Sequence, residues 1–374
     1  MLKHILSFTA AFALLCALPF VCSAQPDVSA EGAILISAGS GRVIAAYNER
    51  ERLPMASTTK IMTALLLAEC GDLSKEIVTT REMVTVEGSS MGLLSGDRVT
   101  YHDLLYGMLL ASGNDAANTT AICLGGSTAG FAELMNVRAA ELGLTDTHFV
   151  TPSGLDDPEH YTTAYDLARL AAFAMQNPLF REAAGAKTAA LCYGNPPYRR
   201  TLTNHNKLLS FYDGCIGVKT GFTKKSGRCL VSAAEREGAT LIAVTLNDGN
   251  DWADHAALLD YGFSLVETRE VSADLPGTVQ VAGGTKTTAV CTAEGATLTL
   301  LPEEFDLVET EVYLDSICFA PVEAGTPLGR VEYRVGENLL ATREIIAAET
   351  VPAAAAQPVK KTTVWDALRR LLQM

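Results

Sequence analysis

Apolar residues follow different periodicities along the chain, and each periodicity predicts a different kind of structure. Two apolar runs within residues 33–47 flank a turn rich in Gly and Ser, which is typical of a β-hairpin. Between residues 57 and 175, apolar positions recur every three or four residues, so this region is predicted to be mainly helical. Two further apolar runs within 228–246 predict adjacent antiparallel strands, and 252–265 returns to a helical pattern. Both ends of a first domain therefore contribute to one sheet, with a helical cluster between them.

A different pattern begins near residue 269 and predicts a second domain. Short runs of Val and Leu, broken by Gly, Pro and Thr, extend over 269–350 and predict a small all-β fold. Residues 351–361 are rich in Pro and Ala and predict a linker. In 362–374, apolar and basic side chains separate onto two faces, which predicts an amphipathic helix that lies in a membrane interface. Docking of this helix on the protein itself is the alternative, but its place after a linker favours the membrane.

The first 24 residues have the pattern of a secretory signal peptide. A basic start precedes an apolar run over residues 5–21 and a Cys-Ser-Ala cleavage site, so Gln25 is the expected first mature residue. The alternative is an N-terminal transmembrane anchor, but the run is shorter than the ~20 residues that a span needs. The first domain is therefore expected to occupy residues 25–268 of an exported protein.

Charge and cysteine content exclude several classes of protein. The formal net charge is −14, whereas a nucleic-acid-binding protein presents a basic face. Of the nine cysteines, Cys16 and Cys22 would be removed with the signal peptide, which leaves seven in the mature chain. An odd number of cysteines cannot all pair in disulfides. The remaining cysteines show no spacing typical of metal ligands. We therefore expect no nucleic-acid partner, no metal and no cofactor.

Three short motifs occur once each, and their order is more informative than any one of them. They are Ser57-Thr58-Thr59-Lys60, Ser112-Gly113-Asn114 and Lys219-Thr220-Gly221. Together they spell S-x-x-K, S-x-N and K-T-G, the motif set of class A β-lactamases and penicillin-binding proteins. The ordered set indicates a serine acyl-transfer enzyme that acts on D-Ala-D-Ala peptides or on β-lactams.

The first motif combines a nucleophile with a base. A serine hydroxyl attacks a carbonyl group only when a base takes its proton. The spacing puts Ser57 and Lys60 on one face of a helix, about one turn apart. Lys60 can act as the base if burial and a second cation, for which Lys219 is the candidate, lower its pKa. A helix cap and an exposed lysine are the simpler interpretation of this pair alone, but the other two motifs favour catalysis.

The second motif follows a helical run and supplies polar side chains. Ser112 can relay a proton between the lysines and the leaving group, and the Asn114 amide can hold the peptide bond of a substrate. An ordinary turn is the alternative, because Ser-Gly-Asn is also good turn chemistry.

The third motif is expected on a strand beside the bound substrate. Lys219 and Thr220 can bind a terminal carboxylate, and Gly221 removes side-chain bulk there. The backbone N–H groups of Ser57 and Phe222 can form the oxyanion hole that a tetrahedral intermediate needs. An edge strand kept soluble by its lysine is the alternative interpretation.

The residues around these motifs resemble the low-molecular-mass penicillin-binding proteins, which are serine-type D-alanyl-D-alanine carboxypeptidases of family S11. The resemblance is carried by the segments 55–63, 87–93, 111–117, 153–156, 160–164 and 213–223. It implies an α/β (α+β) fold, in which a β-lactamase/transpeptidase-like domain with a helical cluster on an antiparallel sheet precedes a small all-β domain. It also implies that Ser57 is the acylated nucleophile and Lys60 the general base. The segment 215–218 is less regular than the family pattern.

The resemblance also implies a reaction and a place in the cell. The enzyme would remove the terminal D-Ala from peptidoglycan pentapeptide, water would resolve the acyl-enzyme, and β-lactam antibiotics would acylate Ser57. Its partners would be peptidoglycan stem peptides, β-lactams and the outer face of the cytoplasmic membrane, on which it would be a peripheral protein.

Several related functions remain open at this point. A DD-endopeptidase or transpeptidase shares the motifs and differs in its substrate or in its acceptor. A class A β-lactamase also shares them, but no Glu-x-x-Leu-Asn occurs between the second and third motifs, and the second domain would be unexplained. A non-catalytic penicillin-binding scaffold would not need intact motifs. A Ser-x-x-Lys pair such as Ser57 and Lys60 also occurs in serine esterases and in glutaminases. The third motif and the predicted signal peptide disfavour both of these enzyme classes.

Overall fold

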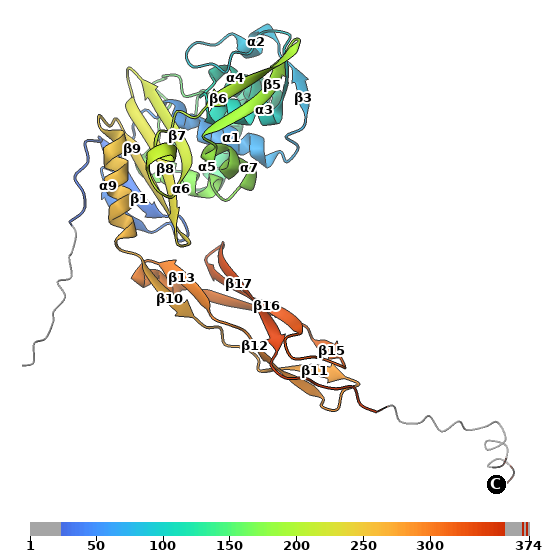
Figure 1. Ribbon diagram of the computed structural model, residues 1–374. Helices are drawn as coiled ribbons and strands as arrows, with labels where there is room; N and C mark the ends of the chain where they lie inside the picture. The colour runs from blue at the N-terminus through green and yellow to red at the C-terminus, as the bar shows by residue number, and fades with distance from the viewer. Residues whose placement is uncertain (1–23, 356–368, 370–371, 373–374) are drawn as a thin grey trace, which may run out of the picture.

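The computed structural model describes residues 24–355 together with residues 369 and 372. A domain of helices and strands lies at the top of Figure 1, and an elongated β domain lies below it. The predicted signal peptide and amphipathic helix, and part of the predicted linker, lie outside the described residues, apart from single positions. Within the described part of the chain, every helix is too short or too polar to cross a membrane.

A five-stranded antiparallel sheet organises the first domain. Its strands are β1 (Gly32–Ser37), β2 (Val43–Tyr47), β7 (Cys215–Thr223), β8 (Gly227–Arg236) and β9 (Ala239–Leu246). Their order is β2-β1-β9-β8-β7, so strands from both ends of the domain pair side by side, as the sequence predicted. The third motif lies on β7, which is an edge strand with one side left unpaired by the sheet.

Alternation along the strands gives the sheet two buried faces. Ile242 and Val244 of β9 pack into the core of the helical cluster, whereas Leu241 packs against the opposite core, which includes Leu258. Leu258 belongs to α9 (Asp251–Phe263), the helix that covers the other face of the sheet in Figure 1. Side chains of a strand point alternately to opposite faces, so a sheet buried on both sides reads as a continuous apolar run.

Short polar side chains cap several of the other helices at their first turn. The other helices are α1 (Lys60–Glu69), α2 (Arg81–Val84), α3 (Tyr101–Leu109), α4 (Asn114–Gly125), α5 (Thr128–Glu141), α6 (Ala164–Ala174), α7 (Pro178–Gly185) and α8 (Leu208–Phe211). The hydroxyls of Thr100, Ser127 and Thr163 each accept a hydrogen bond from the backbone N–H of the third residue of α3, α5 and α6. The pattern of residues 57–175 thus correctly predicted a helical cluster.

A second, four-stranded sheet was not predicted. It contains β3 (Glu76–Val78), β4 (Arg98–Thr100), β5 (Thr188–Gly194) and β6 (Pro197–Thr203), in that order. The guanidinium of Arg200 lies 4.3 Å and 4.2 Å from the ring centroids of Tyr193 and Tyr198. It donates a hydrogen bond of 2.7 Å to the carbonyl oxygen of Gly92. This sheet therefore holds the loop before residue 93 against the domain.

The second domain is built from strands alone, apart from one short 3-10 helix. A two-stranded sheet pairs β10 (Glu267–Val271) with β13 (Ala296–Leu300). A six-stranded sheet has the order β14 (Glu309–Leu314), β16 (Pro327–Val335), β17 (Asn338–Ala347), β12 (Thr288–Thr292), β11 (Thr278–Ala282) and β15 (Ile317–Phe319). The 3-10 helix η2 spans Pro302–Leu307. These strands enclose their own apolar core, which confirms the predicted all-β fold.

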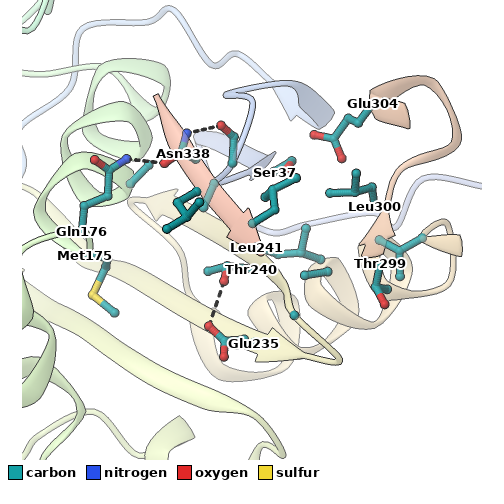
Figure 2. Close-up of a pocket in the computed structure, with 18 of the residues that line it drawn as sticks. Ser37, Met175, Gln176, Glu235, Thr240, Leu241, Thr299, Leu300, Glu304 and Asn338 are labelled. Carbon is teal, nitrogen blue, oxygen red and sulfur yellow. Dashed lines mark hydrogen bonds between the residues drawn. The ribbon is translucent and has the colours of Figure 1, made fainter. Parts of the chain in front are cut away.

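The two domains meet through polar contacts around a cavity of about 580 Å³. Figure 2 shows Asn338 of β17 between Gln176, which donates a hydrogen bond of 2.7 Å to it, and the carbonyl oxygen of Gly39. Arg42 forms an ion pair of 2.7 Å with Glu303. None of the three motifs contributes to the lining of this cavity. The chemistry that the motifs indicate therefore lies elsewhere in the first domain.

Candidate active site

The first motif lies in a tight turn that leads into a helix. Ser57 belongs to the 3-10 turn η1 (Ala56–Thr59), and Lys60 is the first residue of α1. The sequence predicted a helix from Ser57, whereas the regular α-helix begins three residues later. Ala56 has a left-handed backbone with a φ of 47°, and such strain in a residue other than Gly is often found at active sites. The turn brings the Ser57 Oγ atom to 2.9 Å from the Lys60 Nζ atom.

Lys60 is fully buried, and its contacts suit a neutral amine. Its Nζ atom lies 2.7 Å from Asn114 Oδ1 and 2.7 Å from the carbonyl oxygen of Ser153. A neutral amine has two N–H donors for these oxygens and one lone pair that can accept the hydroxyl proton of Ser57. Burial, followed by the charge of Lys219, holds the pKa of Lys60 well below its ordinary value. The site thus contains an amine that can take a proton from the serine.

The second motif faces the third across the site. Lys219 Nζ donates hydrogen bonds of 3.0 Å to Ser112 Oγ and 2.8 Å to the carbonyl oxygen of Thr220. Ser112 lies in the loop between α3 and α4 and has a left-handed backbone with a φ of 55°. Burial lowers the pKa of Lys219 to about 7. A hydroxyl therefore lies against an amine that gains and loses its proton near neutral pH.

The loop at residues 87–93 is held by the residue after the second motif. The buried carboxylate of Asp115 accepts hydrogen bonds from the backbone N–H groups of Met91, Gly92 and Leu93 and from the hydroxyl of Ser90. The side-chain amide of Asn114 donates a hydrogen bond of 2.7 Å to the carbonyl oxygen of Glu87. The backbone N–H of Asn114 donates another, also of 2.7 Å, to the carbonyl oxygen of Ser89. Motif spacing did not assign a role to Asp115, although its place directly after Asn114 was a usable signal.

The loop at 151–156 supplies a hydrogen-bond partner of Lys60 that belongs to none of the three motifs. Ser153 contributes its backbone carbonyl, so the identity of its side chain gives no signal. The next residue, Gly154, has a φ of +85°, and a Cβ atom there would lie only 1.8 Å from the carbonyl oxygen of Ala56. This glycine therefore lets the loop approach the turn that carries Ser57.

The third motif closes the site from the sheet edge. A Cβ atom on Gly221 would lie 3.1 Å from the backbone nitrogen of Ser57, so β7 passes close to the nucleophile. The side chain of Phe222 points outward and is 66% exposed. The backbone segments at Ser57 and at Phe222 therefore lie close together and line the same cavity.

This cavity has a volume of about 460 Å³. Its lining includes Ser57, Ser112, Thr220, Gly221 and Phe222 from the predicted site residues, and also Ser89, His205, Lys207, Arg228, Asp251 and Trp252. The predicted residues Lys60, Asn114 and Lys219 lie behind this lining, buried and joined to it by hydrogen bonds. In the part of the chain that the structure describes, no group of three or more His, Cys, Asp or Glu side chains could hold a metal ion.

Comparison with known proteins assigns both domains. Residues 20–250 match the sequence model of peptidase S11, described as D-alanyl-D-alanine carboxypeptidase. Residues 267–353 match that of the penicillin-binding protein 5, C-terminal domain. The chain is 32% identical to the D-alanyl-D-alanine carboxypeptidase DacF of Bacillus subtilis, over 90% of each chain. It is 37% identical to DacB2 of Mycobacterium tuberculosis, over 64% of this chain and 84% of the relative.

Solved structures agree with these relatives. Penicillin-binding protein 5 from Haemophilus influenzae superposes with a TM-score of 0.61 at 26% identity, over 87% of this chain and 98% of that one. The Streptomyces K15 DD-transpeptidase superposes with a TM-score of 0.61 at 33% identity, over 64% of this chain and 99% of that one. The carboxypeptidase DacD from Francisella tularensis, at 24% identity, has the same fold, with a TM-score of 0.65 over 93% of this chain and 99% of that one.

The close approach of Gly154 to the nucleophile turn can be tested by substitution. We expect Gly154→Ala to lower the free energy of unfolding by at least about 3 kcal/mol, because atomic overlap adds to the ~1–2 kcal/mol penalty of a left-handed Ala. Gly126→Ala is the matched control, since Gly126 has a φ of +72° but no atom within 4 Å of an added Cβ. Urea unfolding of both variants measures the difference. Equal losses would show that the loop moves aside without cost and does not constrain the turn.

Proposed function

Because the chain belongs to peptidase family S11, the D-alanyl-D-alanine carboxypeptidases, we propose that Ser57 attacks the peptide bond before the terminal D-Ala of peptidoglycan pentapeptide. The observation that carries this proposal is the buried Lys60 amine, 2.9 Å from Ser57 Oγ and in contact with two further oxygens. A general base must lie within hydrogen-bond reach of the proton that it takes, and the amine meets this condition.

Acylation follows from the positions of these groups. Lys60 Nζ takes the proton of Ser57 Oγ as the oxygen attacks the carbonyl carbon of the penultimate D-Ala. The backbone N–H groups of Ser57 and Phe222 stabilise the resulting oxyanion. The C–N bond then breaks as the leaving amine receives a proton through Ser112, whose Oγ lies 3.0 Å from Lys219 Nζ. Lys60 passes the proton that it took from Ser57 into this relay, so its amine is neutral again. D-Ala leaves with that proton, and the rest of the peptide stays as an ester on Ser57.

Deacylation repeats the same steps with water as the attacking group. Lys60 Nζ takes a proton from water, and the hydroxyl oxygen attacks the ester carbonyl. The C–O bond to Ser57 then breaks, the proton on Lys60 returns to Ser57 Oγ, and the shortened peptide leaves as a carboxylic acid. A β-lactam acylates Ser57 by the first step, because opening of its ring also breaks a C–N bond. Asn114, which holds both Lys60 and the loop at 87–93, is suited to position the peptide bond of the substrate.

Transfer to an amine is the second candidate, and one comparison favours it. The similar Streptomyces K15 protein is described as a DD-transpeptidase. An amine acceptor would replace water in deacylation and leave the acylation step unchanged. The match of residues 267–353 to the penicillin-binding protein 5, C-terminal domain disfavours a β-lactamase.

We further propose that the enzyme acts outside the cytoplasm, on the outer face of the cell membrane. The support is in the sequence: a secretory pattern over residues 1–24 and an amphipathic pattern with Trp365 and basic residues over 362–374. Lys360 and Lys361 would each add about 1 kcal/mol of attraction to an anionic surface.

The function is tested by release of D-Ala from a diacyl-Lys-D-Ala-D-Ala tripeptide. We expect release by residues 25–361 and a loss of at least about 10⁴-fold in Ser57→Ala, because removal of a nucleophile leaves only binding and electrostatic effects. Labelling of Ser57 by a fluorescent penicillin serves as the control for an intact site. Labelling without D-Ala release would contradict the carboxypeptidase and favour a transpeptidase, an endopeptidase or a silent binder.

The role of Lys60 predicts a pH dependence with a definite sign. Only the neutral amine accepts a proton, so acylation by penicillin should slow as the pH falls through the pKa of Lys60. The charge of Lys219 lowers that pKa. In Lys219→Gln the pKa should therefore rise, and the acid limb of the acylation rate should move to higher pH. Rapid-quench labelling across pH 5–9 measures the limb; a limb that stays in place or moves to lower pH would count against Lys60 as the base.

The membrane proposal predicts the behaviour of a truncated chain. Removal of residues 362–374 should release the protein from membranes while kcat/KM on small peptides stays the same, since these residues lie outside the catalytic domain. Sedimentation with anionic vesicles measures binding, and the full-length mature chain is the control. Continued sedimentation of the truncated protein would place the membrane contact in another part of the molecule.

A further inference from the structure

A buried histidine behind the active site connects the nucleophile turn to the loop at 151–156. His160 is 3% exposed and is not among the residues that line the active-site cavity. Its segment continues to Thr162, whose backbone exchanges hydrogen bonds of 2.8 Å and 3.0 Å with the backbone of Leu53, shortly before η1. Neither the motifs nor the steps of acylation and deacylation give this histidine a role.

The partners of His160 fix the direction of each hydrogen bond around its ring. Its Nδ1 atom lies 2.9 Å from the backbone nitrogen of Val150 and 3.3 Å from that of Thr151, and both N–H groups can only donate. Nδ1 is therefore an acceptor, and the proton of the neutral ring is on Nε2. Nε2 donates a hydrogen bond of 2.7 Å to the hydroxyl of Thr59, which donates one of 2.8 Å to the carbonyl oxygen of Ala56.

The ring stays neutral and takes no part in proton transfer. A second proton, on Nδ1, would point at two N–H donors, and burial lowers the pKa of His160 to about 4. Within residues 24–355, its hydrogen bonds reach neither Ser57 nor Lys60. His160 can therefore affect the reaction only through the backbone that it holds.

One end of this series of bonds fixes the peptide group that contains the Ser57 N–H. The peptide bond between Ala56 and Ser57 is trans, so its C=O and N–H bonds point in opposite directions. The bond from Thr59 holds the Ala56 carbonyl oxygen on the side of Gly154, where an added Cβ atom would lie 1.8 Å from it. The N–H of Ser57 therefore points away from that loop, and its nitrogen lies beside Gly221 of the third motif. This N–H is one of the two donors expected for the oxyanion.

The other end holds the loop that contacts the base. Val150 and Thr151, which donate to Nδ1, lead directly into this loop. The carbonyl oxygen of Pro152 accepts a hydrogen bond of 2.6 Å from a threonine of α1. The next carbonyl oxygen, of Ser153, accepts one of 2.7 Å from Lys60 Nζ. One imidazole ring thus links the expected oxyanion donor to a partner of the base.

We propose that His160 is a positioning residue for acylation. Its Nε2 atom, through Thr59, orients the N–H of Ser57 for the oxyanion. Its Nδ1 atom holds the loop whose Ser153 carbonyl contacts the base. This inference rests on the proposed function, because it concerns the same oxyanion and the same base. The two ring nitrogens have separate effects, so each effect can be removed alone.

Two substrates that differ in one atom isolate the oxyanion contact. Both are diacyl-Lys-D-Ala-D-lactate depsipeptides, with either C=O or C=S at the scissile ester. Sulfur is larger than oxygen and accepts hydrogen bonds weakly, so the ratio of the two kcat/KM values measures stabilisation of the oxyanion by N–H donors. We expect His160→Asn to lower this ratio about 10- to 100-fold, less than the roughly 10²- to 10³-fold cost of losing a whole donor. The shorter amide keeps an acceptor near the place of Nδ1 but does not reach Thr59.

The converse substitution and changes of Thr59 give the matched comparisons. The amide of His160→Gln reaches Thr59 but leaves the loop without its acceptor, so kcat/KM should fall equally for both substrates and the ratio should stay the same. Thr59→Val keeps the shape of the side chain and removes the hydroxyl, so it should lower the ratio as His160→Asn does. Thr59→Ser should restore the ratio, because the hydroxyl returns.

A buried histidine on the other face of the sheet controls for stability. His255 of α9 is fully buried between the hydroxyls of Ser232 and Thr245. We expect His255→Asn to lower the midpoint of thermal unfolding, as His160→Asn does, because buried hydrogen-bond partners are left unsatisfied. The ratio of the two substrates should not change in this control.

Each other outcome contradicts a specific statement. An unchanged ratio in His160→Asn and Thr59→Val would show that the oxyanion donor does not depend on this series of bonds. Equal losses on both substrates in these two variants, or a lower ratio in His255→Asn, would show that His160 only supports the fold. If His160→Asn does not fold, Thr59→Val and Thr59→Ser decide between these outcomes. Failure of the wild-type enzyme to turn over both the oxygen depsipeptide and the D-Ala-D-Ala tripeptide would instead contradict the proposed function itself.

Discussion

The amine of Lys60 is buried and forms no ion pair with a carboxylate of residues 24–355, and the rest of the site depends on this constraint. Transfer of an ammonium group into a protein interior costs several kcal/mol, so such a group tends to lose its proton instead. The amine of Lys60 lies 2.7 Å from two oxygens, an amide and a backbone carbonyl, and neither carries a charge that would hold the proton. The same burial that is unfavourable for a charged lysine is what makes this one a base.

Holding that amine requires three segments to converge on η1. These segments are the start of α4 at Asn114, the loop at 151–156 and strand β7. Each of them packs closely against η1. Gly154 and Gly221 both stand where a Cβ atom would come within 3.1 Å or less of the turn backbone. Asp115 ties the loop at 87–93 to the start of α4 through several hydrogen bonds. The surrounding domain therefore determines the position of Ser57 more than the local sequence does, and this allows Ala56 to keep its left-handed backbone.

The sequence predicted those parts of the structure that leave a signal in apolar periodicity or in the identity of side chains. Apolar spacing predicted the sheet from both ends of the first domain, the helical cluster and the all-β second domain. Motif spacing indicated Ser57 and Lys60 as neighbours, because three residues make about one helical turn. It could not indicate Ser153, which acts through a backbone carbonyl, or the pairing of Arg228 with Asp251, which are 23 residues apart. The polar strands β5 and β6 were missed because many of their side chains face solvent, so their hydrophobic pattern is weak.

The chemistry of the cations around the cavity follows from how much solvent each one contacts. Lys60 and Lys219 are buried, so their proton affinities depend on the protein around them, and burial brings the pKa of Lys219 to about 7. Groups of this kind suit steps in which a proton must move at neutral pH. Arg228 differs from them, because its side chain is 43% exposed and donates a hydrogen bond to the Asp251 carboxylate. The site therefore combines buried amines, whose protonation is set by the surrounding protein, with a more exposed guanidinium that a carboxylate holds in place.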